Sequence, residues 1–267
     1  FLYHLGLGDD KVKQGKRLRP FMTLLCCSGT GTDWRKALPA AAAIELIHNF
    51  SLIHDDIEDN GKIRRGKDSV WIKWGLAQGL NAGDAMFVSA FDVIQQLESE
   101  TTVGIAMNAS KLLAKTCGKL TEGQYLDIDF EKRKKASVNE YLTMIEGKTA
   151  ALISCCTKMG ALIGGLSEDD QEIYFQFGRS LGIAFQIYDD WLGVWGEEEI
   201  MGKTSTGDIL EKKKTLPIIL GIENSERFSR EMQAPVVDPL KVSKLANWLS
   251  EDGIEQLTID AFTQWTD

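Results

Sequence analysis

The sequence predicts an all-α protein, and three observations support this prediction. Apolar residues recur every three to four positions through almost every segment, which is the period of an amphipathic helix. Alternating β-branched runs between tight turns, which would indicate strands, are weak. The 267 residues include five prolines, a low count for a residue that helix interiors tolerate poorly. We therefore expect helices joined by short breaks.

The predicted helices follow one another along the chain. The helix predicted over residues 38–58 opens with Pro39, which suits a first helical position because its missing N–H would be unpaired there. Similar segments follow at 69–98, 103–130, 137–164, 168–195 and 212–224. Breaks are predicted at 29–33, 60–66, 131–135, 196–207 and 224–239. Because no break is long enough to be a linker, we expect one domain over residues 1–267. We also expect it to be trimmed at both termini, since it starts at Phe1.

The composition limits which binding partners and which cellular compartment we expect for the protein. The hydrophobic fraction of 43% is ample for a core, and the net charge of −9 argues against nucleic acid or an anionic membrane as the main partner. No apolar run approaches the roughly 18–20 residues of a transmembrane helix, and we expect no signal peptide. The five cysteines lack zinc-ligand spacing, which predicts reduced thiols in a cytoplasmic protein. They are Cys26, Cys27, Cys117, Cys155 and Cys156.

Asp55, Asp56 and Asp59 form a first cluster of carboxylates, at the end of the helix predicted over residues 38–58. Asp55 and Asp59 lie one turn apart on the same helix face. A helix C-terminus already carries partial negative charge, so these carboxylates need a proton or a cation nearby. Their oxygens suit Mg²⁺, which also takes water and phosphate oxygens as ligands. Taken alone, the cluster is equally consistent with a solvated acidic helix end.

A second aspartate pair, Asp189 and Asp190, ends another apolar helix. Residues 184–190 read Ala-Phe-Gln-Ile-Tyr-Asp-Asp, and residues 50–56 read Phe-Ser-Leu-Ile-His-Asp-Asp. Gln186 lies three and four positions before the two aspartates and can share their face. If the two helix ends face each other across a cavity, they could hold metal ions that neutralise a departing diphosphate.

Basic residues that could bind phosphate groups are scattered along the chain. Arginine binds phosphate oxygens through two N–H groups at once, and lysine acts as a point charge. Most of them, taken singly, are more typical of a solvated surface, and residues 131–135 are interpreted as an exposed loop. The candidates are Lys16, Arg17, Arg19, Arg64, Arg65, Lys148, Lys203, Lys212, Lys213 and Lys214. His48 lies two helical turns before Asp55 on nearly the same face, although a lone helical histidine is usually a packing or surface residue.

These motifs resemble those of the trans-prenyl (polyprenyl) diphosphate synthases, of the short-chain geranylgeranyl and farnesyl type. They occur in the family's order from residue 15 to residue 217, about three quarters of the 267 residues, and order with spacing makes the likeness specific. The matching stretches are 15–20, 48–59, 64–66, 82–85, 123–127, 147–149, 185–190, 202–203, 207–208 and 213–217. One position departs: Gly193 stands where the second Asp-Asp-x-x-Asp motif has its last aspartate.

The resemblance implies the isoprenoid synthase fold, with antiparallel helices around a central cavity, and a homodimer. It implies a prenyltransferase that joins isopentenyl diphosphate head to tail to an allylic diphosphate, in the trans configuration. The cofactor would be Mg²⁺, with Mn²⁺ as a possible substitute. Metals and cations would pull diphosphate off the allylic substrate, isopentenyl diphosphate would attack the carbocation, and a proton would be lost. No protein nucleophile is needed, and the sequence shows no nucleophile–histidine arrangement.

The resemblance also implies a role for each matching residue. The metal ligands would be Asp55, Asp56, Asp59, Asp189 and Asp190. The allylic diphosphate would be bound by Arg64, Lys148, Thr149, Gln186, Lys203 and Lys213. Isopentenyl diphosphate would be bound by Lys16, Arg19, His48 and Arg65. Polar support near the metals would come from Gln124 and Asp127.

Phe50 is the predicted floor of the cavity that receives the growing chain. It lies five residues before Asp55, about 7.5 Å along the helix, and its neighbour Ser51 is small. An aromatic residue here, without a two-residue insertion in the first motif, resembles the C20 (geranylgeranyl diphosphate) synthases, with C15 (farnesyl diphosphate) as the second candidate. Alternatively Phe50 is ordinary core, and the floor comes from residues 86–89.

Two other functions remain open. A class I terpene cyclase shares the helical architecture, but its second metal motif needs a serine where Leu192 and Gly193 stand. A catalytically silent subunit of a hetero-oligomeric synthase would typically lose the first aspartates or the arginine pair, and this chain keeps both. Gly193 is the feature that favours a silent subunit.

Overall fold

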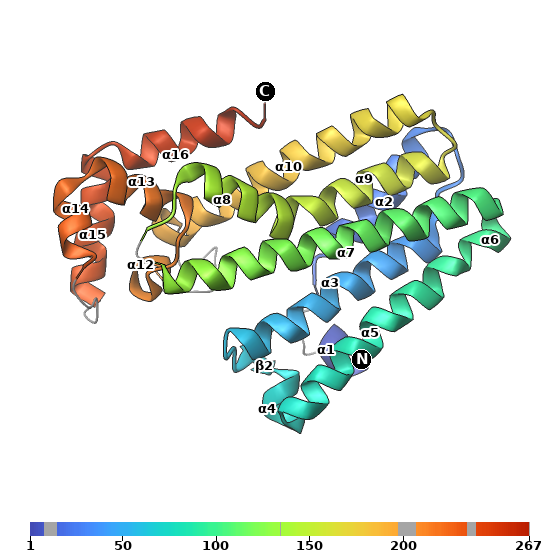
Figure 1. The fold of residues 1–267 in the computed structure, drawn as a ribbon, viewed down its shortest axis with the longest axis horizontal. Helices are drawn as coiled ribbons and strands as arrows, with labels where there is room; N and C mark the ends of the chain where they lie inside the picture. Colours follow the sequence, from blue (N-terminus) through green and yellow to red (C-terminus); the bar gives the residue numbers. More distant parts are fainter. Residues whose placement is uncertain (8–14, 134, 197–206, 234–238, 267) are drawn as a thin grey trace. The chain divides into compact units, whose positions relative to one another are not determined.

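The computed structural model describes the chain apart from residues 8–14, 134, 197–206, 234–238 and 267. In the described parts the secondary structure is helical except for one pair of very short strands, which confirms the all-α prediction (Figure 1). The helices gather into two compact units. Residues 1–117 and 154–178 form unit 1, and residues 118–153 and 179–267 form unit 2. The prediction of one domain over the whole chain stays a prediction.

Unit 1 is built around the helices α3 and α5, which pack along each other (Figure 1). Its elements in chain order are α1 (Leu2–Leu5), α2 (Leu18–Gly29), the 3₁₀ turn η1 (Trp34–Ala37), α3 (Leu38–Glu58), β1 (Ile63–Arg64), β2 (Lys67–Asp68), α4 (Val70–Trp74), α5 (Leu76–Gln95) and α6 (Leu97–Glu100). Three long helices have residues in both units: α7 (Val103–Lys132), α9 (Ala151–Ile163) and α10 (Glu168–Trp195).

The predicted helix 38–58 is confirmed as α3, with proline in its first turn. The helix predicted over 69–98 is wrong as a single element. Gly75 adopts a φ of 89°, a conformation that ends α4 and that favours glycine, so the chain restarts as α5. Ile53, Val70 and Met86 form a buried cluster beneath the end of α3, with Phe50 and Ala82 among the side chains packed against it. This cluster anchors the helix end that carries the first aspartates.

Unit 2 continues from α7 with α8 (Val138–Ile145), the π-helical turn η2 (Glu146–Ala150), α12 (Gly207–Glu211), α13 (Leu216–Asn224), α14 (Glu226–Glu231), α15 (Pro239–Glu251) and α16 (Ile254–Thr263). The helix predicted over 137–164 is therefore interrupted, and the interruption contains Lys148. The segment predicted over 212–224 becomes helical at Leu216, because Pro217 favours the first turn of a helix. The break predicted over 224–239 contains α14.

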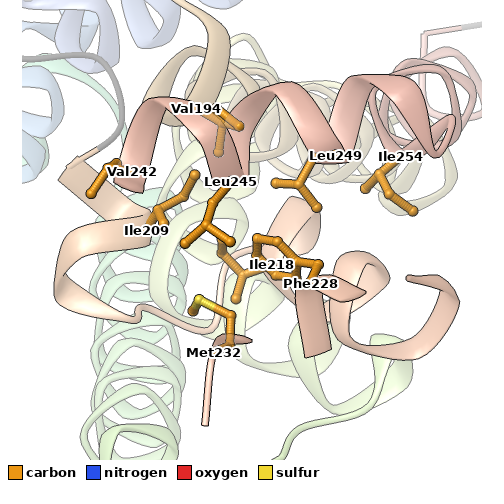
Figure 2. Close-up of a cluster of buried hydrophobic side chains, with 10 residues drawn as sticks. Val194, Ile209, Ile218, Phe228, Met232, Val242, Leu245, Leu249 and Ile254 are labelled. Carbon is orange, nitrogen blue, oxygen red and sulfur yellow. The ribbon is translucent and has the colours of Figure 1, made fainter. Parts of the chain in front are cut away.

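The core of unit 2 holds these short helices in place. Figure 2 shows Ile209 of α12, Ile218 of α13, Phe228 of α14 and Leu245 of α15 converging with Val194 of α10. Burying this apolar cluster fixes α12 and the start of α13 beside α10, the helix that carries the second aspartate pair.

Two further expectations concern the whole chain. The five cysteines, all within described segments, are free thiols. Among the described residues, no helix combines the length and the apolar character that crossing a membrane requires.

Candidate active site

The first aspartate cluster divides into an inward-facing carboxylate and two outward-facing ones. Asp56 is buried, with 2% of its surface exposed, whereas Asp55 is half-buried and Asp59 is exposed. Arg64 holds the Asp56 carboxylate with three short contacts: Nε lies 3.0 and 3.2 Å from its two oxygens, and Nη2 lies 2.7 Å from Oδ1. Asp55 and Asp59 are linked through the helix backbone, where the amide of Asp59 donates to the carbonyl of Asp55 at 2.8 Å.

The two neighbouring arginines point to different partners because Arg64 ends a strand and Arg65 begins a tight turn. Strands β1 and β2 pair antiparallel, with Arg64 opposite Lys67. The two residues between them, Arg65 and Gly66, have φ values of 55° and 79°, the positive angles that tight hairpins favour. Arg65 therefore turns away from Asp56. It donates to the carbonyl of His4 at 2.9 Å and to Oδ1 of Asn49 at 3.1 Å.

A compact cationic group forms upstream of the aspartates on α3. Nη1 of Arg19 lies 3.2 Å from Nε2 of His48, and because arginine can only donate, His48 accepts through Nε2. Burial, together with the charges of Arg19, Arg65 and Arg64, lowers the pKa of His48 to about 2. The imidazole is therefore neutral at ordinary pH. Lys16, just before α2, is exposed.

Acid is expected to destabilise the protein through its buried neutral histidines. The pKa of His4 falls to about 3, because of burial and then the charges of Arg65 and Arg64, and that of His48 falls to about 2. The unfolded chain binds these protons near pH 6.5, so the unfolded state holds more protons below that pH. The stabilisation is complete above about pH 6.5 and is lost as the pH falls, by at most about 1.4 kcal/mol per pH unit for each histidine.

Urea unfolding of the wild type and of His48→Gln between about pH 7 and pH 5 measures this effect. The variant keeps an acceptor for Arg19 and should lose less stability on acidification. Equal slopes for the two proteins would contradict the prediction.

The residues predicted to set chain length lie together on α3 and α5. The ring of Phe50 meets that of Phe87 edge to face, with centroids 5.0 Å apart, and Phe87 meets Phe91 at 5.2 Å. The hydroxyl of Ser51 donates to the carbonyl of His48 at 2.9 Å. The two candidate floors, Phe50 and the segment 86–89, are thus in contact through Phe87.

Asp190, in the second pair, is also an inward-facing carboxylate. It is 4% exposed and accepts three hydrogen bonds: from the Tyr141 hydroxyl at 2.6 Å, from the Leu216 amide at 3.1 Å and from Nε2 of Gln186 at 2.9 Å. Burial raises the pKa of Asp190 to about 7, although these three donors oppose the shift. Asp189, its neighbour, is exposed. One carboxylate thus joins α8, α10 and the start of α13.

Polar side chains of the π-helical turn connect to this network. Thr149 donates to Oε1 of Gln186 at 2.7 Å, so Gln186 bridges Thr149 and Asp190. Lys148 forms an ion pair with Asp127 of α7. The turn lies very close to α7, where Gly123 faces it. Gln124 is half-buried on α7, and Lys213 is exposed and pairs with Glu211 at 3.0 Å. Lys203, also predicted for this site, lies outside the described residues.

The space beside Gly193 is restricted by a side chain from another helix. A Cβ atom at this position would lie 2.3 Å from Oδ2 of Asp208 and 2.9 Å from its Cγ. The carboxylate of Asp208, on α12, therefore occupies the space into which a side chain at position 193 would point. The second motif lacks its last aspartate at position 193, but the carboxylate of Asp208, from a different helix, lies next to that position.

The two aspartate pairs share an asymmetry that sequence reasoning missed. In each, the first aspartate faces outward and the second is buried against protein donors. Asn49, Tyr141 and Asp208 were also missed as partners, although Asn49 and Asp208 lie inside the matching stretches. Within the described segments, no three histidine, cysteine, aspartate or glutamate side chains converge to hold a metal. The outward carboxylates still fit Mg²⁺, which is commonly bound through one or two carboxylates with substrate phosphates and water.

Residues 7–247 match the family model described as polyprenyl synthetase. The chain belongs to the polyprenyl synthetase family. It is 45% identical to the geranylgeranyl diphosphate synthase of Methanosarcina mazei over 214 residues, which are 80% of this chain and 65% of that protein. It is 39% identical to the (2E,6E)-farnesyl diphosphate synthase of Mycobacterium tuberculosis over 241 residues, 88% of this chain and 66% of that protein.

The fold likeness extends over almost the whole chain. A polyprenyl synthetase from Streptomyces coelicolor superposes with a TM-score of 0.91 at 33% identity, covering 99% of this chain and 82% of that one.

The chain spans about two thirds of the length of the curated relatives named above, 65% and 66%.

Proposed function

We propose that this polyprenyl synthetase is a prenyltransferase that joins isopentenyl diphosphate to an allylic diphosphate, head to tail and with trans geometry. One observation carries the proposal. Helix α3 presents outward carboxylates at Asp55 and Asp59, and two helical turns before Asp55 the neutral His48 lies within the charges of Arg19 and Arg65. Carboxylates suit a metal-bound diphosphate, and cations suit a diphosphate bound directly. Two distinct diphosphate sites are what this reaction requires.

The outward carboxylates Asp55, Asp59 and Asp189 are the proposed direct ligands of Mg²⁺, or of Mn²⁺ in its place. Asp56 and Asp190 would contribute to the site indirectly, because they orient the side chains that donate to them, Arg64 and Gln186. Bound metal would supply positive charge to the departing diphosphate. Lys148, Thr149 and Gln186 would bind the allylic diphosphate, together with Arg64, Lys203 and Lys213. Gln124 and Asp127 would support this group, the latter through its ion pair with Lys148.

Isopentenyl diphosphate would be bound by Arg19, Arg65, His48 and Lys16. Neutral His48 can donate through Nδ1 while Nε2 accepts from Arg19, so it adds a hydrogen bond without adding charge. The allylic C–O bond breaks and its electron pair leaves with diphosphate. The double bond of isopentenyl diphosphate then attacks the cation, and the released diphosphate takes up the proton that is lost. The protein holds both substrates in position and excludes water from the carbocation.

The proposed product is geranylgeranyl diphosphate, with farnesyl diphosphate as the alternative. Relatives that bear each of these names match the chain at 45% and 39% identity. The contact between Phe50 and Phe87 supports an aromatic floor at this depth. We further propose a cytoplasmic homodimer, and the free thiols are consistent with a reducing compartment.

Phe50→Ala is expected to lengthen the main product by at least one five-carbon unit, because it removes the ring that the growing chain would meet. Products are extracted after turnover and sized by chromatography. Val88→Ala is the control, since Val88 neighbours Phe87 on α5 but is 66% exposed. An unchanged product from Phe50→Ala, together with a longer product from Phe87→Ala, would indicate that the floor of the chain-length cavity lies on α5.

The proposed function is tested by incubating the purified protein with Mg²⁺, isopentenyl diphosphate and a C5, C10 or C15 allylic diphosphate. Elongated products with at least one primer are expected. Cyclic hydrocarbon formed from an allylic diphosphate alone would instead identify a terpene cyclase. No turnover alone, restored by a second chain, would identify a silent subunit. No product under any of these conditions would refute the proposal.

A further inference from the structure

The segment of residues 1–7 lies against the hairpin that carries the arginine pair, and it is fixed there from both sides. The Tyr3 hydroxyl donates to the carbonyl of Asp68 at 2.8 Å, and Lys67 donates to the carbonyl of Tyr3. The Tyr3 ring lies beneath two ammonium groups, 4.0 Å from Nζ of Lys67 and 4.1 Å from Nζ of Lys73. It also meets Trp74 edge to face, with centroids 4.8 Å apart. Each cation over an aromatic face is stabilising.

This docking places a backbone carbonyl beneath Arg65. The carbonyl of His4, the residue after Tyr3, accepts from Nη1 of Arg65 at 2.9 Å. The His4 side chain is buried, at 3% exposure, so the peptide has little freedom to turn away. Leu5 packs against the buried cluster of Ile53, Val70 and Met86.

Asn49 completes the support from the other side. It is fully buried, and its amide nitrogen donates to both the carbonyl and the carboxylate of Glu45, at 2.8 and 2.9 Å. Those two bonds orient its oxygen, which accepts from Nη2 of Arg65 at 3.1 Å. Two of the five guanidinium N–H groups are thereby used for orientation.

We infer that Tyr3 and Asn49 are positioning residues for isopentenyl diphosphate, because they hold the two acceptors that orient Arg65. This inference rests on the proposed function, which assigns Arg65 to that substrate. It adds residues that do not touch the substrate, and it makes the 1–7 segment a support of the binding site. Both acceptors are neutral, so the positive charge of Arg65 is kept for the diphosphate.

The test compares Tyr3→Ala with the matched control Leu2→Ala, whose side chain is in the same segment but 67% exposed. Calorimetric titration with isopentenyl diphosphate should show an increase in Kd of about tenfold for Tyr3→Ala, the effect of one lost hydrogen bond to a charged group. Steady-state kinetics should show a similar increase in KM for isopentenyl diphosphate, with KM for the allylic primer unchanged. Tyr3→Phe keeps the ring that both lysines contact and should recover most of the affinity.

Asn49→Ala provides an independent second variant, with the same expected split between the two KM values. If Tyr3→Ala bound isopentenyl diphosphate as tightly as the wild type, the inference would be overturned. A fall in kcat with neither KM changed would also overturn it, because that result indicates fewer folded molecules rather than a misplaced arginine. A wild type that binds neither isopentenyl diphosphate nor inorganic diphosphate would instead refute the proposed function, and this inference with it.

Discussion

Asp55→Asn is expected to lower kcat by about 10²–10³-fold while leaving the metal-free protein as stable as the wild type. The carboxylate of Asp55 faces outward at the end of α3, and the substitution removes its charge without changing its size. Losing one electrostatic contact to the departing group typically costs that much in rate. Relief of repulsion from Asp59, one turn away, should offset any lost local contact.

Glu58→Gln is the matched control, because Glu58 is an exposed acidic residue at the same helix end. It should retain most of the activity. Binding of Mn²⁺, followed by electron paramagnetic resonance in the presence of an allylic diphosphate, provides a measure separate from turnover. It should weaken for Asp55→Asn and not for Glu58→Gln. Similar activity in both variants would remove Asp55 from the proposed metal site.

Gly123→Ala is expected to destabilise the protein by about 3 kcal/mol and to abolish activity. A Cβ atom at Gly123 would lie 2.1 Å from the backbone nitrogen of Lys148 and 2.5 Å from the carbonyl carbon of Gly147. These are backbone atoms and cannot rotate away, so the cost should reach the upper part of the usual range for overpacking, about 1–3 kcal/mol. Any shift of the π-helical turn also moves Lys148 and Thr149.

Gly118→Ala, on the same helix, is the control. Among the described residues, no atom beyond the neighbouring backbone of the helix itself lies within 4 Å of a Cβ built there, so the substitution should stabilise the protein by up to about 1 kcal/mol, since alanine is the better helix former. Urea unfolding measures both changes, and steady-state kinetics measures the activity. A Gly123→Ala protein as stable as the wild type would show that α7 and the turn can separate without cost.

Much of the architecture was predictable because the long helices have local causes. Helices α3 and α10 match their predicted ranges, since amphipathic periodicity and the proline near the start of α3 act within the segment itself. Where prediction failed, single residues decided the outcome. Gly75 divides one predicted helix through its positive φ, and Pro217 shifts the start of α13.

The alignment of His48 with the aspartates on α3 was likewise predictable, because it follows from the helical repeat alone. The partners of these residues were not. Arg65 contacts His4 and Asn49, which lie 61 and 16 positions away, and no local rule connects them. Arg65 lies in the turn between β1 and β2, and the partners that it meets there depend on the segments packed against the hairpin.

The chain's own sequence therefore determined the helical class, the family motifs and the two aspartate pairs, because each depends on residues that lie close together in the sequence. Tertiary structure alone decided that Asp56 and Asp190 turn inward while Asp55 and Asp189 face out. A helix places adjacent aspartates about 100° apart, and only the donors packed beside it, such as Arg64 and Tyr141, select which one is buried. The surroundings of Gly193 were likewise set by tertiary structure, since the carboxylate that restricts the space there comes from Asp208 on another helix.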